Sequence, residues 1–194
     1  MEELLKLNRE DVEPRIRKEF VLSTAIIQAA ITFFPLLFLA VILAFPVLNP
    51  EIGKDESLDP QMAMLLLQVL GLICLVAIVV GVYLPSFLLK PASLHARAEQ
   101  QLASGSDPVT WMCNIYRTSV IIRLAFLEGA ALCGLMPPLM ASLGGYLDDN
   151  PVFWLGAIPL AIHVIAGVVT FPTRTSIANH LVTRILRPIK QSAA

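Results

Sequence analysis

Residues 60–89 read PQMAMLLLQVLGLICLVAIVVGVYLPSFLL, thirty residues that include no charged side chain. A helix of about 20 apolar residues crosses a hydrocarbon layer of about 30 Å, so this stretch can span a membrane with turns to spare. Three other stretches share its apolar character, and they cover residues 20–48, 118–147 and 151–173. The sequence therefore predicts an integral membrane protein.

The composition of the whole chain agrees with this class. Of its 194 residues 56% are hydrophobic and 15% are charged, and the mean hydropathy is +0.73, whereas about a quarter of the residues of a soluble domain are charged. The first stretch is about twice the length of a signal-peptide core, and residues 1–19 ahead of it mix both signs of charge, so we expect the stretch to remain in the mature protein. We expect the lipid bilayer, and no nucleic acid, as a partner.

Basic residues lie almost entirely on one side of the predicted spans. Twelve precede the first span, lie between the second and third, or follow the fourth, and only Lys54 falls on the other side. This positive-inside bias predicts that both termini and the middle connection are cytoplasmic, in a bacterial type of inner membrane. The twelve are Lys6, Arg9, Arg15, Arg17, Lys18, Lys90, Arg97, Arg117, Arg174, Arg184, Arg187 and Lys190.

The predicted fold is all-α, a four-helix bundle of two membrane hairpins. A membrane domain over residues 20–172 holds spans at about 20–48, 61–89, 118–146 and 151–171, with a cytoplasmic segment at 1–19, a cytoplasmic loop at 90–117 and a C-terminal segment at 173–194. Within the loop, helix-forming residues predict a short helix over Ala92–Ala103, ahead of a break at Ser104, Gly105 and Ser106. Asp107 is a predicted N-cap, with Pro108 as the first residue of the third long helix.

The C-terminal segment has a basic and an apolar face. Ile177, Leu181, Ile185 and Leu186 are spaced as on one side of a helix, with basic residues between them. This pattern is typical of a helix that lies on the inner leaflet and contacts anionic lipid headgroups. The alternative is a simple extension of the fourth span, although Pro172 interrupts the backbone there.

Glu128 is the one acidic residue predicted within a span. Counting from Thr118 places it about 15 Å deep, near the middle of the layer. A charged side chain at that depth costs about 2.5–3.5 kcal/mol, so the carboxyl must find a partner or bind a proton. Arg123 is the nearest basic residue in sequence, but it lies about 140° around the helix and can extend to the headgroups, so a direct pair is not favoured.

Two other polar residues are predicted at a similar depth, His163 on the fourth span and Gln28 on the first. With Glu128 they would form a polar layer, which is either an interhelical hydrogen-bond network or a path for a proton or another ion. We expect no metal site, because the three histidines and the cysteines Cys74, Cys113 and Cys133 show no ligand spacing. We expect no cofactor.

Small side chains surround Glu128. Ala125, Gly129 and Cys133 recur at every fourth position, and Ala130 and Gly134 repeat the interval one residue on, which predicts a close-packed helix face. Further along, Pro137 and Pro138 remove two backbone donors, and we expect a kink there.

Residues 117–135, RTSVIIRLAFLEGAALCGL, resemble the second helix of the membrane-ring c subunit of rotary ATP synthases. The resemblance implies that Glu128 carries a translocated proton or sodium ion, and that the loop before this helix faces the cytoplasm. It covers about 20 residues of the chain. The second span, with Gly71 and Gly81, lacks the family's run of glycines, and residues 105–108 lack its Arg-Gln-Pro loop.

The sequence predicts a small membrane protein without enzymatic activity, since the spans contain no HExxH, GxSxG or paired aspartates. The function that we expect is a structural or accessory subunit that self-associates or joins a membrane complex. The alternative is a proton- or cation-translocating subunit in which Glu128 is the carrier.

Overall fold

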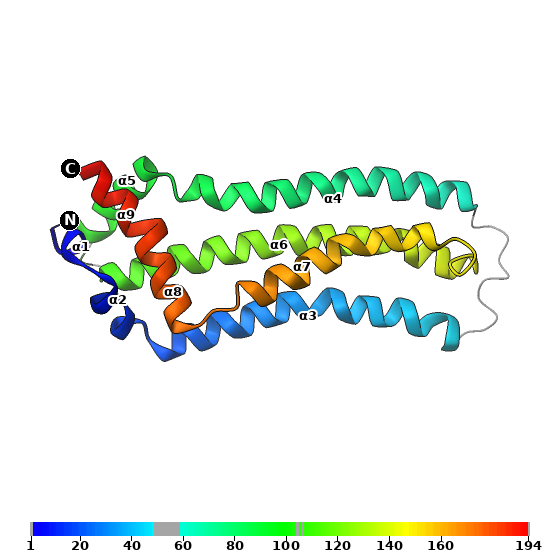
Figure 1. Ribbon diagram of the computed structural model, residues 1–194, viewed down its shortest axis with the longest axis horizontal. Helices are drawn as coiled ribbons and strands as arrows, with labels where there is room; N and C mark the ends of the chain where they lie inside the picture. Colours follow the sequence, from blue (N-terminus) through cyan, green and yellow to red (C-terminus); the bar gives the residue numbers. More distant parts are fainter. Residues whose placement is uncertain (1, 49–58, 104, 106, 194) are drawn as a thin grey trace. The chain divides into compact units, whose positions relative to one another are not determined.

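The computed structural model describes residues 2–48, 59–103, 105 and 107–193, and every regular element among them is a helix (Figure 1). Four helical segments are long and apolar enough to cross a membrane, namely Lys18–Ala44, Pro60–Phe87, Pro108–Leu143 and Pro151–Val169. The predicted all-α membrane fold with four spans is confirmed. Lys54, the one basic residue predicted on the other side of the spans, and Ser104 and Ser106 of the predicted break lie outside the described residues.

The chain divides into two compact units. Unit 1 draws its described residues from Met1–Gln28, Val82–Arg123 and Thr170–Ala194, and unit 2 from Ala29–Gly81 and Leu124–Val169. Three long helices contribute to both units: α3 (Lys18–Leu48), α4 (Pro60–Leu88) and α6 (Pro108–Leu143). Unit 1 also holds α1 (Glu2–Lys6), α2 (Arg9–Arg15), α5 (Pro91–Ala103), α8 (Arg174–His180), the π-helix η2 (Leu181–Leu186) and α9 (Arg187–Ala193). The 3₁₀-helix η1 (Pro151–Ala157) and α7 (Ile158–Val169) belong to unit 2.

Polar side chains cap the helices of unit 1 where the sequence predicts helix starts. Asp107 accepts hydrogen bonds from the backbone N–H and the hydroxyl of Thr110, at 2.8 and 2.9 Å, and pairs with Arg15. Burial alone would raise the pKa of Asp107, but these hydrogen bonds and the Arg15 charge outweigh it and hold the pKa of this carboxyl below its ordinary value. The predicted N-cap at Asp107 and the predicted short helix, which is α5, are therefore confirmed.

The C-terminal segment packs into the core of unit 1. Ile177, Leu181, Ile185 and Leu186, predicted to dip into lipid headgroups, are at most 1% exposed. They contact apolar residues of α1, α2, α5 and α6 in one cluster, and Figure 1 shows α8 and α9 beside these shorter helices. The apolar face of this segment is therefore covered by protein. The alternative extension of α7 is also not seen, because α7 ends at Val169 and Thr173 caps a new helix through the N–H of Ser176.

Two basic residues of this segment hold the N-terminal helices in place. Arg174 donates to the backbone oxygen of Ile16, which follows α2, with its Nη2 at 2.6 Å and its Nε at 3.1 Å. Lys190 Nζ donates to the backbone oxygen of Leu7, just after α1, at 2.8 Å. The C-terminal end of a helix carries unpaired carbonyls and a partial negative charge, so both cations stabilise the helix ends that they reach.

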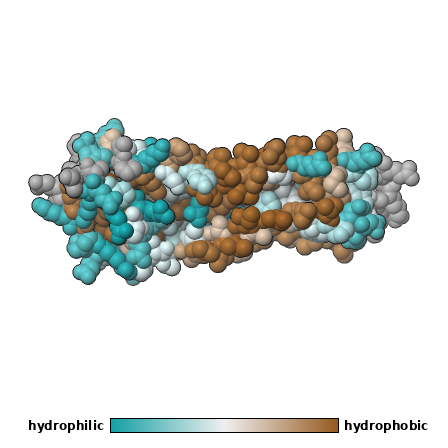
Figure 2. Space-filling view, turned by 45° about the horizontal axis from the view of Figure 1, so that its top comes forward, coloured by the Kyte–Doolittle hydropathy of each residue, from teal (hydrophilic) through white to brown (hydrophobic). Residues whose placement is uncertain are grey.

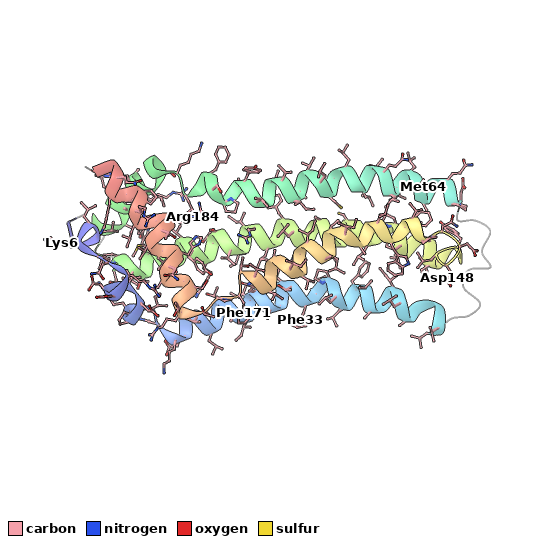
Figure 3. All side chains as sticks on the ribbon, viewed as in Figure 1. Lys6, Phe33, Met64, Asp148, Phe171 and Arg184 are labelled. Carbon is pink, nitrogen blue, oxygen red and sulfur yellow. The ribbon has the colours of Figure 1, made fainter. Side chains whose placement is uncertain are left out.

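In unit 2, α6 packs against helices on two sides. Ala131 and Leu135 form one cluster with Ile42 of α3 and Leu160 of α7, whereas Ala141 forms a second with Ala63 of α4 and Phe153 of η1. Large hydrophobic side chains are exposed along α3 and α4, among them Phe33 at 63% and Leu72 at 64%, and Phe33 is labelled in Figure 3. Hydrophobic residues cover much of the surface of the long helices in Figure 2, as expected for a surface in contact with lipid.

The buried tail gives a stability prediction. Leu181→Ala should lower the free energy of unfolding by about 2–5 kcal/mol, because it leaves a cavity in a closed core. The matched control is Leu72→Ala, which removes the same atoms from a side chain that is 64% exposed and should have little effect. Thermal unfolding of both variants in detergent micelles measures the difference. Equal melting temperatures for the two variants would contradict the core position of Leu181.

Candidate functional site

Gln28 lies on α3 and is 1% exposed. Its Nε2 donates a hydrogen bond to the hydroxyl of Thr170, at 3.3 Å, within unit 1. Thr170 directly follows α7, so the bond connects α3 with the residue that comes after the fourth span. A burial of this kind is typical of a polar group that fastens two membrane helices together.

His163 lies on α7 and is fully buried in unit 2. Its Nε2 lies 3.2 Å from the backbone oxygen of Ile31 on α3, and a backbone oxygen only accepts, so Nε2 carries the proton of this bond. The Nδ1 atom is buried without a partner among the described residues, which fits a neutral ring with its single proton on Nε2. His163 therefore serves as a donor from the fourth span to the first.

The Glu128 side chain on α6 is half-buried. No hydrogen bond or ion pair reaches its carboxylate from the described residues of unit 2, and none joins it to His163 there. Within unit 1, Gln28 likewise pairs with Thr170 and Arg123 lies close to His180 and Tyr116. Within unit 2 the structure therefore leaves Glu128 without a protein partner among the described residues.

The small residues around Glu128 occupy two different surfaces. Ala130 and Gly134 are buried, and the backbone oxygen of Ala130 accepts a hydrogen bond from Cys74 Sγ at 3.1 Å. Ala125 and Gly129 are exposed, and a Cβ added to Gly129 would meet no atom within 4 Å. Cys133 lies between the two surfaces and is half-buried.

Gly134 lies where α6 and η1 approach closely in unit 2. A Cβ at Gly134 would collide with the backbone oxygen of Gly156, and a Cβ at Gly156 would collide with that of Gly134. Pro138 and Pro159 pack beside this crossing, and α6 continues through Pro137 and Pro138 to Leu143, so neither proline ends the helix. Only residues without a side chain allow the two backbones to come this close.

A second polar group in unit 1 was not predicted from the sequence. Arg123, His180 and Arg184 surround a cavity of about 260 Å³ with Ser86 and Ser119. These residues come from α4, α6, α8 and η2, segments far apart in the chain. The sequence marks His180 and Arg184 only as parts of an amphipathic segment, so no local signal links them to Arg123.

Comparison of the chain with models of protein families, with curated proteins and with solved structures finds no match.

The glycine crossing gives a prediction that separates the two small-residue surfaces. Gly134→Ala should lower the free energy of unfolding by about 1–3 kcal/mol, because the added methyl group must push two backbones apart. Gly71→Ala is the control, since a Cβ at that position on α4 meets nothing within 4 Å. Thermal unfolding in detergent checks the pair. A Gly134→Ala protein that melts together with Gly71→Ala would show that the crossing tolerates a side chain.

Proposed function

We propose that the protein is a structural or accessory membrane subunit, without catalytic activity of its own, that self-associates or joins a membrane complex. The surface that makes the contact is the exposed side of α6, here called the α6 stripe, which consists of Ala125, Gly129 and Cys133 with Glu128 beside them. The observation that carries the proposal is the open space at Gly129 on a helix long and apolar enough to cross a membrane.

Small residues have a physical role only where another helix approaches. A glycine that faces lipid gains no packing, whereas a glycine that faces a second helix lets the two backbones come close enough for dispersion contacts and weak hydrogen bonds. The chain already uses this device inside unit 2, at Gly134 and Gly156. The α6 stripe offers the same geometry, with nothing from its own unit seated on it at Gly129.

Glu128 supports the same interface. A carboxyl at the predicted mid-depth of the layer costs about 2.5–3.5 kcal/mol when it is charged and faces lipid. A second chain that covers the α6 stripe would remove this side chain from lipid and could donate hydrogen bonds to it. The orientation that accompanies this proposal places both termini in the cytoplasm of a bacterial cell, and it rests on the distribution of basic residues.

The second candidate is a proton- or cation-translocating subunit with Glu128 as the carrier. Two observations favour it: the half-buried Glu128 side chain has no counter-ion among the described residues of unit 2, and residues 117–135 resemble the ion-carrying helix of the c subunit. A carrier must exchange its proton repeatedly, so a carboxylate without a fixed salt bridge suits that role.

The α6 stripe can be tested with one matched pair of variants. Gly129→Leu should weaken self-association about tenfold, because the new side chain separates the packed helices at a cost of about 1–3 kcal/mol. Gly71→Leu places the same side chain on another exposed span glycine that meets nothing within 4 Å, and it should associate as the parent does. Förster transfer between labelled chains in liposomes, at a series of protein-to-lipid ratios, measures association. If both variants associate like the parent, the stripe is not the interface.

Glu128→Gln distinguishes the two candidate functions. The amide keeps the shape of the carboxyl but changes its hydrogen bonds, each worth about 0.6–2 kcal/mol in a bilayer, so association should weaken about three- to thirtyfold. Proton flux into vesicles that contain the protein should be the same for the parent and the variant. A flux that the parent supports and the variant loses, with association unchanged, would instead establish the carrier role.

A further inference from the structure

The cavity in unit 1 is lined by hydrogen-bond donors. Arg123 and Ser119 reach it from α6, Ser86 from the end of α4, and His180 and Arg184 from α8 and the π-helix η2. No acidic residue is among the described residues that line it. The hydroxyl of Thr183, which also faces the cavity, donates to the backbone oxygen of Asn179 at 2.7 Å and so is already used. The cavity is therefore a space of about 260 Å³ with several donors and a net positive charge.

Both guanidinium groups lie near a neutral imidazole. Burial, and then the charges of Arg184 and Arg123, lower the pKa of His180 to about 4, so the ring is uncharged at neutral pH. Its Nε2 atom is buried and has no hydrogen-bond partner among the described residues. The ring of Tyr116 packs against it edge-on, with 5.1 Å between centroids, which fixes its direction. The positive charges of Arg123 and Arg184 repel each other, and the buried Nε2 of His180 lacks a hydrogen-bond partner among the described residues. Both features are unfavourable, and an anion bound between these groups would offset both.

The surroundings of the cavity are apolar and exposed. Val82 and Pro85 of α4, Leu89 just after it and Pro188 of α9 also line the cavity. Next to them in the chain, Tyr83 and Phe87 are 63% and 58% exposed. These residues end the candidate span Pro60–Phe87, so the cavity lies at the level where a span meets the headgroup region. A free anion would make no favourable contact with this apolar surface. A lipid has a charged head group that fits the cavity and acyl chains that fit the apolar surface.

We propose that this cavity binds the phosphate group of an anionic membrane phospholipid, held between Arg123 and Arg184, with the acyl chains lying against the exposed apolar surface of α4 beside it. Guanidinium groups bind phosphate oxygens through paired, charge-assisted hydrogen bonds. The hydroxyls of Ser86 and Ser119 and the Nε2 of His180, in its protonated tautomer, supply further donors. Figure 3 labels Arg184, which is exposed and belongs to the irregular π-helical stretch of the C-terminal segment. This site is independent of the α6 stripe.

The test uses the full-length protein in detergent micelles, titrated with dimyristoylphosphatidylglycerol and followed by native mass spectrometry. Arg123→Gln and Arg184→Gln should each weaken retention of the lipid about tenfold, because each removes a charge-assisted pair. Arg187→Gln is the matched control: it removes the same charge three residues from Arg184, at an exposed side chain that does not line the cavity. Its binding should stay within about twofold of the parent, because the Arg187 side chain does not line the cavity and forms no charge-assisted pair with the phosphate there. An equal loss in all three variants would overturn the site, since it would show general attraction to a basic surface.

A measurement on the unaltered protein keeps the proposal testable if the arginine variants fail to fold. A phosphate bound beside His180 favours the charged imidazole, so the pKa of His180, followed by nuclear magnetic resonance, should rise from about 4 when phosphatidylglycerol is added. Inorganic phosphate and phosphatidylcholine at equal concentration should change it much less. An unchanged His180 pKa with phosphatidylglycerol overturns the proposal. An equal rise with inorganic phosphate overturns the lipid assignment and leaves a site for free phosphate.

Discussion

Hydrocarbon offers no hydrogen bonds, and this constraint decides how the chain is built. A backbone that crosses it must satisfy its own polar groups, which leaves helices as the only form for the four spans. The same constraint acts on side chains, and two polar side chains buried in unit 2 meet it through backbone oxygens: Cys74 donates to Ala130, and His163 to Ile31. Each of these bonds joins two different helices. At these two positions, the burial of a polar group also attaches one helix to another.

Glu128 has no hydrogen-bond or ion-pair partner among the described residues of unit 2, so this rule does not explain its position. The small residues on the buried side of α6 already make contacts within unit 2. The backbone oxygen of Ala130 accepts a hydrogen bond from Cys74, and the backbone at Gly134 packs against that at Gly156. Its neighbours on the other side, Ala125 and Gly129, are exposed. The carboxyl thus lies next to the one small-residue surface of α6 that the described residues of its unit leave open. The charged Glu128 side chain would be costly to expose to lipid, and it lies beside a helix face that its own unit leaves open. This arrangement is better explained as one side of an interface with another chain than as a surface that faces lipid.

Much of the fold could be predicted from the sequence because hydrophobic length, proline and capping residues act locally. The four spans, the start of α6 at Asp107 and the helix α5 follow from such signals. The burial of Ile177 and Leu181 could not be predicted, because amphipathic spacing shows that a face will be covered but does not show what covers it. Depth alone also placed Glu128 and His163 in one layer. Residues at equal depth can point to different sides of their helices, and the partner of His163 proved to be a backbone oxygen.

The distribution of basic residues in the sequence predicts the orientation of the chain in the membrane, whereas the structure of unit 1 shows which acceptor each basic side chain contacts. The positive-inside bias counts Arg174, Lys190 and Arg117 as equal charges. In the structure Arg174 and Lys190 cap the ends of α2 and α1, and Arg117 donates to Ser23 at 2.8 Å. These side chains already have acceptors from the protein. Arg123, which the sequence assigns to a span, instead shares a cavity with Arg184, and no carboxylate is among the described residues that line it. A charge that orients the chain can also stabilise its fold. Two like charges without a carboxylate beside them do not, so an anion from outside the chain accounts for their arrangement better than folding alone does.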